Sequence, residues 1–409
     1  RSINNTTYGF FVDRNYVLHG NLAQGNDVGF HADEISSTIG SGAFLGTGYD
    51  AANVAFGNQT GIAVQSGVAQ YNRVVGNAVD GIRATFNPVD IVGNIVYGNS
   101  VGIHVSAQFR GTRVLGNLSY DNTNQAIYIH NSATSGSGTF GLRVDNNTLW
   151  QDVGTALWLA NNGSDVRLRN NVISIGAGSG MVVDGATIGF SSDRTNVFRT
   201  TGDANWGTWK GAAAATLAAW QVASGTDATS YSVNPLHVDV DGADNRFGWD
   251  RLDAASPFQD FGRDDNSLLA KFSPMIDAAD SFEAPATDLF GRPRHDDPGV
   301  ANTGVGAIAF YDLGAFEFMA SSGDVTPPAV IGLAPMGLVN DAIVSTLVDR
   351  IAISFSEAMD PIRATSGSLY SLVDAGDDGQ FDTADDEVIV PMTIEYAANT
   401  NSAALVLEE

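Results

Sequence analysis

The stretch RVLGNLSYDNTNQAIYI, residues 113–129, holds two short apolar segments separated by an Asn-rich turn. Segments this short cannot bury a face alone, but identical copies stacked side by side build a continuous core. Further copies occupy most of the first half of the chain. They are YVLHGNLAQGNDVGF (16–30), NVAFGNQTGIAV (53–64), RVVGNAVDGIRA (73–84), DIVGNIVYGNSVGIHV (90–105), RVDNNTLWQDVGTALWL (143–159) and RLRNNVISIGAGSGMVV (167–183).

Each clear copy contains a Gly-Asn or Asn-Asn step. The second Asn of this step falls at Asn77, Asn94, Asn117, Asn147 and Asn171, with spacings of 17, 23, 30 and 24 residues. We therefore predict one coil per repeat, with loops of variable length. Parallel stacking lets Asn side chains hydrogen-bond along a ladder at a corner of the coil. These Asn residues are predicted to be structural and not catalytic.

Val and Ile dominate the repeat, and its length varies more than that of a leucine-rich repeat. Over roughly residues 10–200 the pattern resembles the right-handed parallel β-helix family, which includes pectate-lyase-like and alginate-active proteins, tailspikes and many bacterial surface proteins. The resemblance implies an all-β solenoid of coils over 1–200, in a bacterial protein that is secreted or held at the cell surface. It specifies the fold far better than the activity.

The repeat pattern ends near residue 200, and residues 201–320 form a second region. ATLAAWQVASG (215–225) has the spacing of a short amphipathic helix. SPMIDAAD (273–280), TDLFGRPR (287–294) and DLGAFEF (312–318) together resemble the closing segment of bacterial β-helix proteins that carry a sorting anchor. We expect a buried or half-buried polar network that closes the end of the stack. Its members are Asp277, Asp288, Arg292, Arg294, Asp312 and Glu317.

Residues 321–409 form a third, acidic region. DVTPPAVIGLAPMG (324–337) is typical of a linker, and DRIAISFSEAMDP (349–361) of a strand that ends in a turn. The region resembles the Ig-like modules of large bacterial surface proteins. It stops at LVLEE, so the resemblance implies an Ig-like β-sandwich that is truncated here. Because the chain also opens inside patterned sequence, we expect it to be a piece of a longer precursor.

Charge is distributed unevenly along the 409 residues. The net charge is −26, yet residues 1–200 carry 11 Arg against 13 Asp and Glu. The acidic second half would repel nucleic acid, so no nucleic-acid partner is expected. There is no Cys, and no apolar run approaches the roughly 20 residues that a membrane span needs. The sequence gives no indication of the oligomeric state.

The segment DAGDDGQFDTADDE concentrates carboxylates around a Gly that permits a tight turn. Ca²⁺ requires six to eight oxygen ligands of this kind. We predict a Ca²⁺ site here, with a solvated acidic hairpin as the alternative. The candidate ligands are Asp374, Asp377, Asp378, Asp382, Asp385 and Asp386.

The Gly-Ile-x-Val strand of each repeat presents its x residue to solvent, because side chains alternate along a strand. Aligned coils therefore predict one outward row, composed of Ala63, Arg83, His104, Tyr128, Trp158 and Val182. Neighbouring coils stand about 4.8 Å apart. The four middle members would form a basic and aromatic stripe of about 15 Å, which suits two to three sugar units.

A second predicted row comes from the other strand of the repeat and holds Arg73, Asp90, Arg113, Arg143 and Arg167. Arg binds carboxylates and sulfates through paired hydrogen bonds, so both rows together indicate an acidic polysaccharide as ligand. The predicted contacts from these rows are Arg73, Arg83, His104, Tyr128, Arg143, Trp158 and Arg167. In the alternative interpretation, the same residues are ordinary strand residues, paired with Asp90 and Asp145.

Three functions remain open at this stage. The leading one is non-catalytic binding of an extended, acidic polysaccharide. A polysaccharide lyase would use His104 as base, Tyr128 as acid and Arg83 or Arg113 to neutralise the uronate, with His130 as a second candidate base. A hydrolase would instead need two carboxylates, for which Asp90 and Asp145 are the candidates. The third function is a structural stalk or adhesin segment.

Overall fold

The fold was obtained as a computed structural model and divides into two compact units, residues 1–319 and 320–409. Each is described by itself. The structure describes residues 1–13, 16–33, 37–40, 52–107, 111–130, 141–160, 165–185, 187, 189–249, 260–319, 329–334, 348–357, 359, 364–365, 370, 372–374, 387–389, 391, 393–397 and 400–407.

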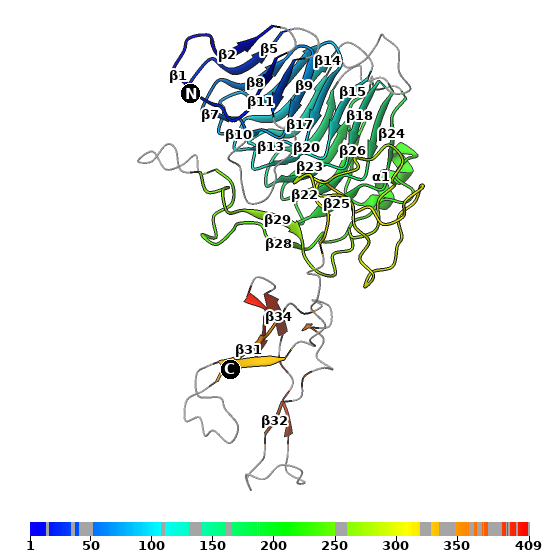
Figure 1. The fold of residues 1–409 in the computed structure, drawn as a ribbon. Helices are drawn as coiled ribbons and strands as arrows, with labels where there is room; N and C mark the ends of the chain where they lie inside the picture. The colour runs from blue at the N-terminus through cyan, green and yellow to red at the C-terminus, as the bar shows by residue number, and fades with distance from the viewer. Residues whose placement is uncertain are drawn as a thin grey trace. The chain divides into compact units, whose positions relative to one another are not determined.

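The first unit is a parallel β-helix, as predicted, in which every third strand is hydrogen-bonded to the next (Figure 1). Each coil thus gives one strand to each of three parallel sheets, here named A, B and C. Sheet A contains β1 (Ser2–Ile3), β4 (Leu22–Gln24), β7 (Val54–Phe56), β10 (Arg73–Val75), β13 (Ile95–Tyr97), β16 (Leu118–Tyr120), β19 (Thr148–Gln151), β22 (Val172–Ile175) and β25 (Asn196–Arg199).

Sheets B and C complete the coils. Sheet B contains β2 (Tyr8–Val12), β5 (Val28–Ala32), β8 (Thr60–Val64), β11 (Asp80–Phe86), β14 (Val101–Ala107), β17 (Gln125–His130), β20 (Thr155–Ala160), β23 (Gly178–Val183), β26 (Ala204–Trp209) and the antiparallel β27 (Ala212–Ala214). Sheet C contains β3 (Val17–Leu18), β6 (Thr38–Gly40), β9 (Gly67–Gln70), β12 (Val89–Val92), β15 (Thr112–Leu115), β18 (Leu142–Asp145), β21 (Val166–Arg169) and β24 (Ser191–Asp193).

The steps Gly93–Asn94, Gly116–Asn117, Asn146–Asn147 and Asn170–Asn171 form the corner of the coil between sheets C and A. Gly93 occupies the left-handed region there with φ 62°, and Asn146 does so two coils later with φ 54°. Asn is among the few residues other than Gly that tolerate this conformation. The two forms of the step are therefore interchangeable versions of one turn.

The predicted Asn ladder is present at this corner. The Nδ2 group of Asn94 donates to Oδ1 of Asn117 at 3.0 Å, and Asn117 donates in the same way to Asn147 at 3.0 Å. The placement of Asn77 in this ladder was wrong. Asn77 belongs to a second ladder, at the corner between sheets A and B, where its Nδ2 donates to Asn99 at 2.9 Å.

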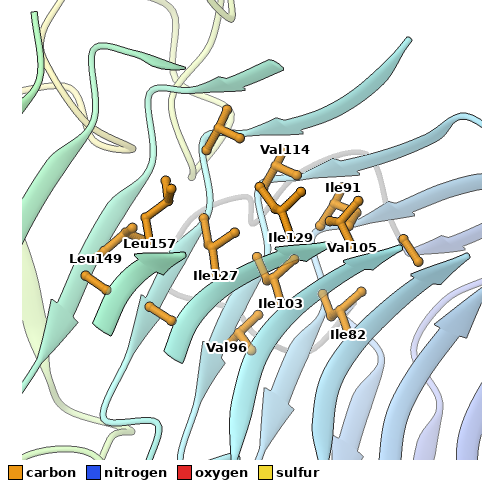
Figure 2. Close-up of a cluster of buried hydrophobic side chains, with 14 of the residues drawn as sticks. Ile82, Ile91, Val96, Ile103, Val105, Val114, Ile127, Ile129, Leu149 and Leu157 are labelled. Atoms are coloured by element: carbon orange, nitrogen blue, oxygen red, sulfur yellow. The ribbon is translucent and has the colours of Figure 1, made fainter. Parts of the chain in front are cut away.

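The interior of the β-helix is filled by stacked aliphatic side chains (Figure 2). Ile82, Ile103, Ile127 and Leu157 are in register on successive strands of sheet B, and all four are completely buried. Each such side chain contributes about 1.5–3 kcal/mol to folding. Because side chains alternate along each strand, the residues next to these point outward and are free to carry function.

The predicted helix is α1, Leu217–Ser224, with Thr216 as its N-cap. Its buried Trp220 packs on Trp206 of the last parallel strand of sheet B, with ring centroids 5.3 Å apart. A Cβ at Gly207 would lie 2.5 Å from the Trp220 ring, so the glycine permits this contact. The helix covers the end of the hydrophobic interior.

The polar network of residues 277–317 exists, but the prediction that it closes the end of the stack was wrong. Asp277, Asp312 and Glu317 are completely buried, and Arg294 Nη1 lies 2.8 Å from Glu317 Oε2. Residues 277–317 lie along the side of the β-helix instead. The N–H of Gly314 donates to the carbonyl of Asn170, between sheets C and A.

Residues from 231–249 and 260–318 also pack on the outer face of sheet A. Tyr97 and Tyr120, which point outward from it, are buried in a cluster with Phe247, Trp249 and Phe316. The antiparallel pair β28 (His237–Asp239) and β29 (Asn266–Leu269) belongs to this covering segment. Segments that are remote in sequence thus remove the part of sheet A around Tyr97 and Tyr120 from the accessible surface.

The second unit contains a four-stranded antiparallel sheet in the order β30 (Val330–Ala334), β31 (Arg350–Phe355), β35 (Ser402–Val406) and β34 (Thr393–Ala397). The predicted strand within 349–361 corresponds to β31. A short antiparallel pair joins β32 (Val373–Asp374) to β33 (Glu387–Val388). The Ig-like nature of this unit and its truncation stay predictions. Among the described residues, no helix is long and apolar enough to cross a membrane.

Candidate functional site

Arg73 does not belong to the row in which the sequence placed it. It lies in β10 of sheet A, in register with Ile95, and 3% of it is exposed. Its Nη2 group lies 2.6 Å from Asp260 Oδ2 and also donates to the hydroxyl of Tyr97. Arg73 is therefore part of the interface between sheet A and its covering segment, and is withdrawn as a ligand-binding residue.

The other members of the second row are in register on sheet C as predicted: Asp90, Arg113, Arg143 and Arg167. The guanidinium groups of the three arginines already form ion pairs with acidic side chains. Arg113 Nε donates to Asp90 at 2.7 Å, and this hydrogen bond raises the pKa of Arg113. Arg143 and Arg167 both pair with Asp145 and with Glu283. An anionic ligand would have to compete with these bonds.

These pairings also bear on the hydrolase alternative. Oδ2 of Asp145 lies 3.0 Å from Arg143, and Asp145 is almost completely buried. Asp90 is tied to Arg113. A general acid or base must be free to exchange a proton with substrate. Neither carboxylate is free in that sense, and the salt-bridge interpretation describes this row better.

The outward row of sheet B is in the predicted register. Arg83 pairs with Ala63 and His104, and Tyr128 pairs with His104 and Trp158. Rings on neighbouring coils touch, since the centroid of Tyr128 lies 5.0 Å from that of His104 and 5.4 Å from that of Trp158. The side chain of Arg83 is 50% exposed. The row therefore offers a cation followed by three contiguous rings.

His104 is also the centre of a hydrogen-bonded chain, Asp80–His104–His130. Its Nδ1 lies 3.1 Å from Oδ1 of Asp80, and its Nε2 lies 3.1 Å from Nδ1 of His130. Asp80 is buried, with 3% of its side chain exposed. A carboxylate can only accept, so a neutral His104 donates from Nδ1 and accepts at Nε2. His130 then donates from Nδ1 and keeps a basic lone pair on Nε2.

The surroundings shift two pKa values in this chain and row. Burial lowers the pKa of His130, and His104 and Arg83 lower it further, whereas Asp80 acts in the opposite direction. Burial raises the pKa of Tyr128, with a smaller contribution from Asp184. At neutral pH, His130 is therefore unprotonated and Tyr128 keeps its proton. One group can accept a proton and the other can donate one.

A hollow of about 400 Å³ adjoins Arg83 on the same face. Its position follows from the row, because the small side chain of Ala63 lies between the larger His31 and Arg83 of the flanking coils. The hollow is lined by Tyr8, Val28, His31, Thr60, Ala63, Gln65, Arg83, Thr85, Phe86 and Ser106. Its volume falls within the usual range of small-molecule sites.

The predicted Ca²⁺ site cannot be placed. Asp374 ends strand β32, but Asp377, Asp378, Asp382, Asp385 and Asp386 lie outside the described residues. Within the described part of the chain, no group of three or more His, Asp or Glu side chains is arranged to hold a metal ion.

Three features were not predicted from the sequence. They are the contact of Asp80 with His104, the position of His130 as the last member of the hydrogen-bonded series, and the hollow beside Arg83. Asp80 precedes the Gly-Ile-x-Val strand and carries no local signal of its contact with the next coil. No protein-family model matches this sequence, and no curated protein matches it significantly. The function must therefore be argued from the site itself.

Proposed function

We propose that the protein binds an extended, acidic polysaccharide along the outward face of sheet B. The observation that carries this proposal is the unbroken row formed by Arg83, His104, Tyr128 and Trp158 on four successive coils. Flat rings spaced by about 4.8 Å offer repeated apolar platforms to the C–H faces of sugars. The half-exposed guanidinium at one end can bind a carboxylate or sulfate with two hydrogen bonds.

The distribution of covered surface supports this choice of face. The outer face of sheet A around Tyr97 and Tyr120 is packed under residues from 231–249 and 260–318, and the arginines of sheet C are engaged by acidic partners. Of the predicted binding residues, those in the row on sheet B remain partly exposed. In this row the guanidinium of Arg83 is half exposed and can contact a ligand. A bacterial secreted or cell-surface location belongs to this proposal, and so does Ca²⁺ binding by the acidic segment near Asp374.

Retention of the purified protein on immobilised uronate-containing, sulfated and neutral polysaccharides tests the proposal. The wild-type protein should be retained on an acidic polymer, and Trp158→Ala should weaken this by about tenfold, as loss of one stacking ring does in comparable sites. Phe282→Ala is the matched control, because Phe282 is an exposed ring outside the row. Equal retention of both variants and the wild type would contradict the proposal.

The Asp80–His104–His130 chain favours a second candidate function, a polysaccharide lyase. In β-elimination a base removes the C5 proton of a uronate, the C4–O4 bond breaks, and a C4–C5 double bond forms. In this arrangement Nε2 of His130 is the base, Tyr128 protonates the leaving oxygen and Arg83 neutralises the carboxylate. His104 then positions and polarises His130 and is not itself the base.

Ultraviolet absorbance of the unsaturated product distinguishes the two candidates. An absorbance rise that disappears in both His130→Ala and Tyr128→Phe would establish the lyase. Retention on the polymer without product would leave binding as the function. With neither retention nor product, the structural stalk or adhesin segment would be the remaining interpretation.

A further inference from the structure

The outward row of sheet B has one gap. His31, Ala63 and Arg83 occupy equivalent positions on three successive strands, and the middle one has only a methyl group. The flanking positions are two strand spacings apart, about 9.6 Å. The hollow of about 400 Å³ lies at this gap, so it is built by the register of the sheet.

The walls of the hollow combine the two kinds of group that bind a sugar ring. Tyr8 and Phe86 supply aromatic surface and are 43% and 52% exposed. Gln65, Thr85 and Ser106 supply amide and hydroxyl groups. Phe86 ends β11 with φ 68°, a conformation that is unusual for a bulky residue. Such outliers persist where the surroundings hold them and concentrate at binding sites.

The charge of the lining specifies the ligand further. None of the ten lining residues is Asp or Glu, although the chain carries a net charge of −26. Arg83 is half exposed, and its Nε lies 3.9 Å from Asp80, which is longer than a hydrogen bond. Burial lowers the pKa of His31, so that Arg83 is the cation of the hollow at neutral pH. A carboxylate on the bound sugar would complement it.

We propose that the hollow over Ala63 is a subsite for one uronate residue, whose ring packs over Ala63 against the aromatic lining and whose carboxylate binds Arg83. This inference rests on the proposed function and deepens it. The inference identifies the sugar unit whose negative charge is recognised. This sugar would lie beside the Asp80–His104–His130 chain. The rings of His104, Tyr128 and Trp158 then take the following sugars.

Calorimetric titration with uronate trimers tests the subsite. The probes are the trimers of galacturonate, glucuronate, mannuronate and guluronate, each as the free acid and as the methyl ester, in which the carboxylate charge is removed. The wild-type protein should bind one free acid at least about tenfold more tightly than its ester, the effect of one charge-assisted interaction. Arg83→Gln should abolish this preference. Ala63→Trp should weaken binding of the same trimer by about tenfold or more, because its side chain fills the hollow.

Val182→Trp is the matched control, since Val182 holds the same outward position at the far end of the row. It should bind the trimer as the wild type does. If Ala63→Trp binds the trimer normally while Trp158→Ala loses retention on the polymer, the subsite is wrong and the proposed function stands. If Ala63→Trp binds the trimer and Trp158→Ala is retained on the polymer as the wild type is, both fail. The subsite is also wrong if the wild-type protein is retained on the polymer but binds no trimer, or if it binds the free acid and the ester equally well. Arg83→Gln keeps the test decisive should Ala63→Trp fail to fold.

Discussion

His104 and Asp80 lie on neighbouring coils, and the Nδ1 atom of His104 is 3.1 Å from a carboxylate that is almost completely buried. This contact fixes which atom donates and which accepts in the hydrogen bond between His104 and His130. Because Asp80 can only accept, His104 presents Nε2 as an acceptor to His130. In the proposed lyase the base is therefore His130, the hydrogen-bonded neighbour of His104, and not His104 as the sequence favoured.

The first prediction concerns the pKa of His130. Asp80→Asn should lower it, because the carboxylate of Asp80 stabilises the imidazolium form. Arg83→Gln should raise it, because the guanidinium of Arg83 destabilises the same form. NMR titration of the histidine ring protons measures both shifts. Arg113→Gln, on sheet C, is the control and should leave the value unchanged. Shifts of the same sign in both variants would refute the assigned chain.

A second prediction concerns the Asn ladder. Asn117 is completely buried; it donates to the carbonyl of Ile91 and to Asn147, and its Oδ1 accepts from Asn94. Asn117→Ala removes these three hydrogen bonds and leaves the backbone N–H of Asn94, which donates to the same Oδ1, without its acceptor. A buried unsatisfied group costs about 1–3 kcal/mol, and each lost hydrogen bond about 0.5–1.5 kcal/mol. We expect a loss of about 3 kcal/mol in the free energy of unfolding, measured by urea denaturation.

The matched control for the ladder is Asn124→Ala. Asn124 is an exposed Asn near the same coil, and its side chain donates to Ser100. Exposed substitutions of this kind change stability by no more than about 0.5 kcal/mol. A similar loss in both variants would show that the ladder adds nothing beyond local turn preference.

A third prediction separates Arg73 and Arg83, the two arginines of the repeat copy at 73–84. Arg73→Ala should cost about 3–5 kcal/mol, because it removes a buried guanidinium that pairs with Asp260 and donates to Tyr97 within the interface. It should leave retention on acidic polysaccharide unchanged. Arg83→Ala should have the opposite profile, with weakened retention and a stability change within about 0.5 kcal/mol. Thermal unfolding and retention, measured on both variants, decide it, and equal profiles would contradict the assignment of faces.

The confusion of Arg73 with the sheet C row shows what local sequence can specify. The repeat fixes which side chains point inward, so the register of Arg83, His104, Tyr128 and Trp158 followed from the Gly-Ile-x-Val strand alone. Both corners of the coil, however, carry the same step, Gly76–Asn77 at one and Gly93–Asn94 at the other. A local pattern cannot tell the two corners apart.

Long-range contacts are the second limit. Whether an outward residue of sheet A is buried depends on residues from 231–249 and 260–318, which lie far away in sequence and pack on part of that sheet. The chain Asp80–His104–His130 likewise joins three successive coils whose loops differ in length. The three residues come together only when the coils are stacked, so their contacts cannot be predicted from their spacing in the sequence.

The last prediction concerns pH and the buried Asp277. Burial raises the pKa of Asp277 to about 7 from its ordinary value of 3.8, with a further contribution from Asp296. The folded state therefore binds more protons than the unfolded state between about pH 4 and 7. The stability that Asp277 contributes is present below this window and lost as the pH rises through it. Asp312, whose pKa burial raises to about 8, acts in the same direction.

Asp277→Asn should remove part of this loss. No described donor lies in good hydrogen-bond geometry to either carboxylate oxygen, and φ of Asp277 is 52°, a conformation that Asn tolerates well. The variant should unfold at the same temperature as the wild type near pH 5, where the wild-type carboxyl is protonated, and at a higher temperature near pH 8. Circular dichroism measures both, with the exposed Asp203→Asn as control. If Asp277→Asn were equally destabilising at both pH values, Asp277 would have to be a charged, paired carboxylate, and the acid-stabilised segment inferred here would be wrong.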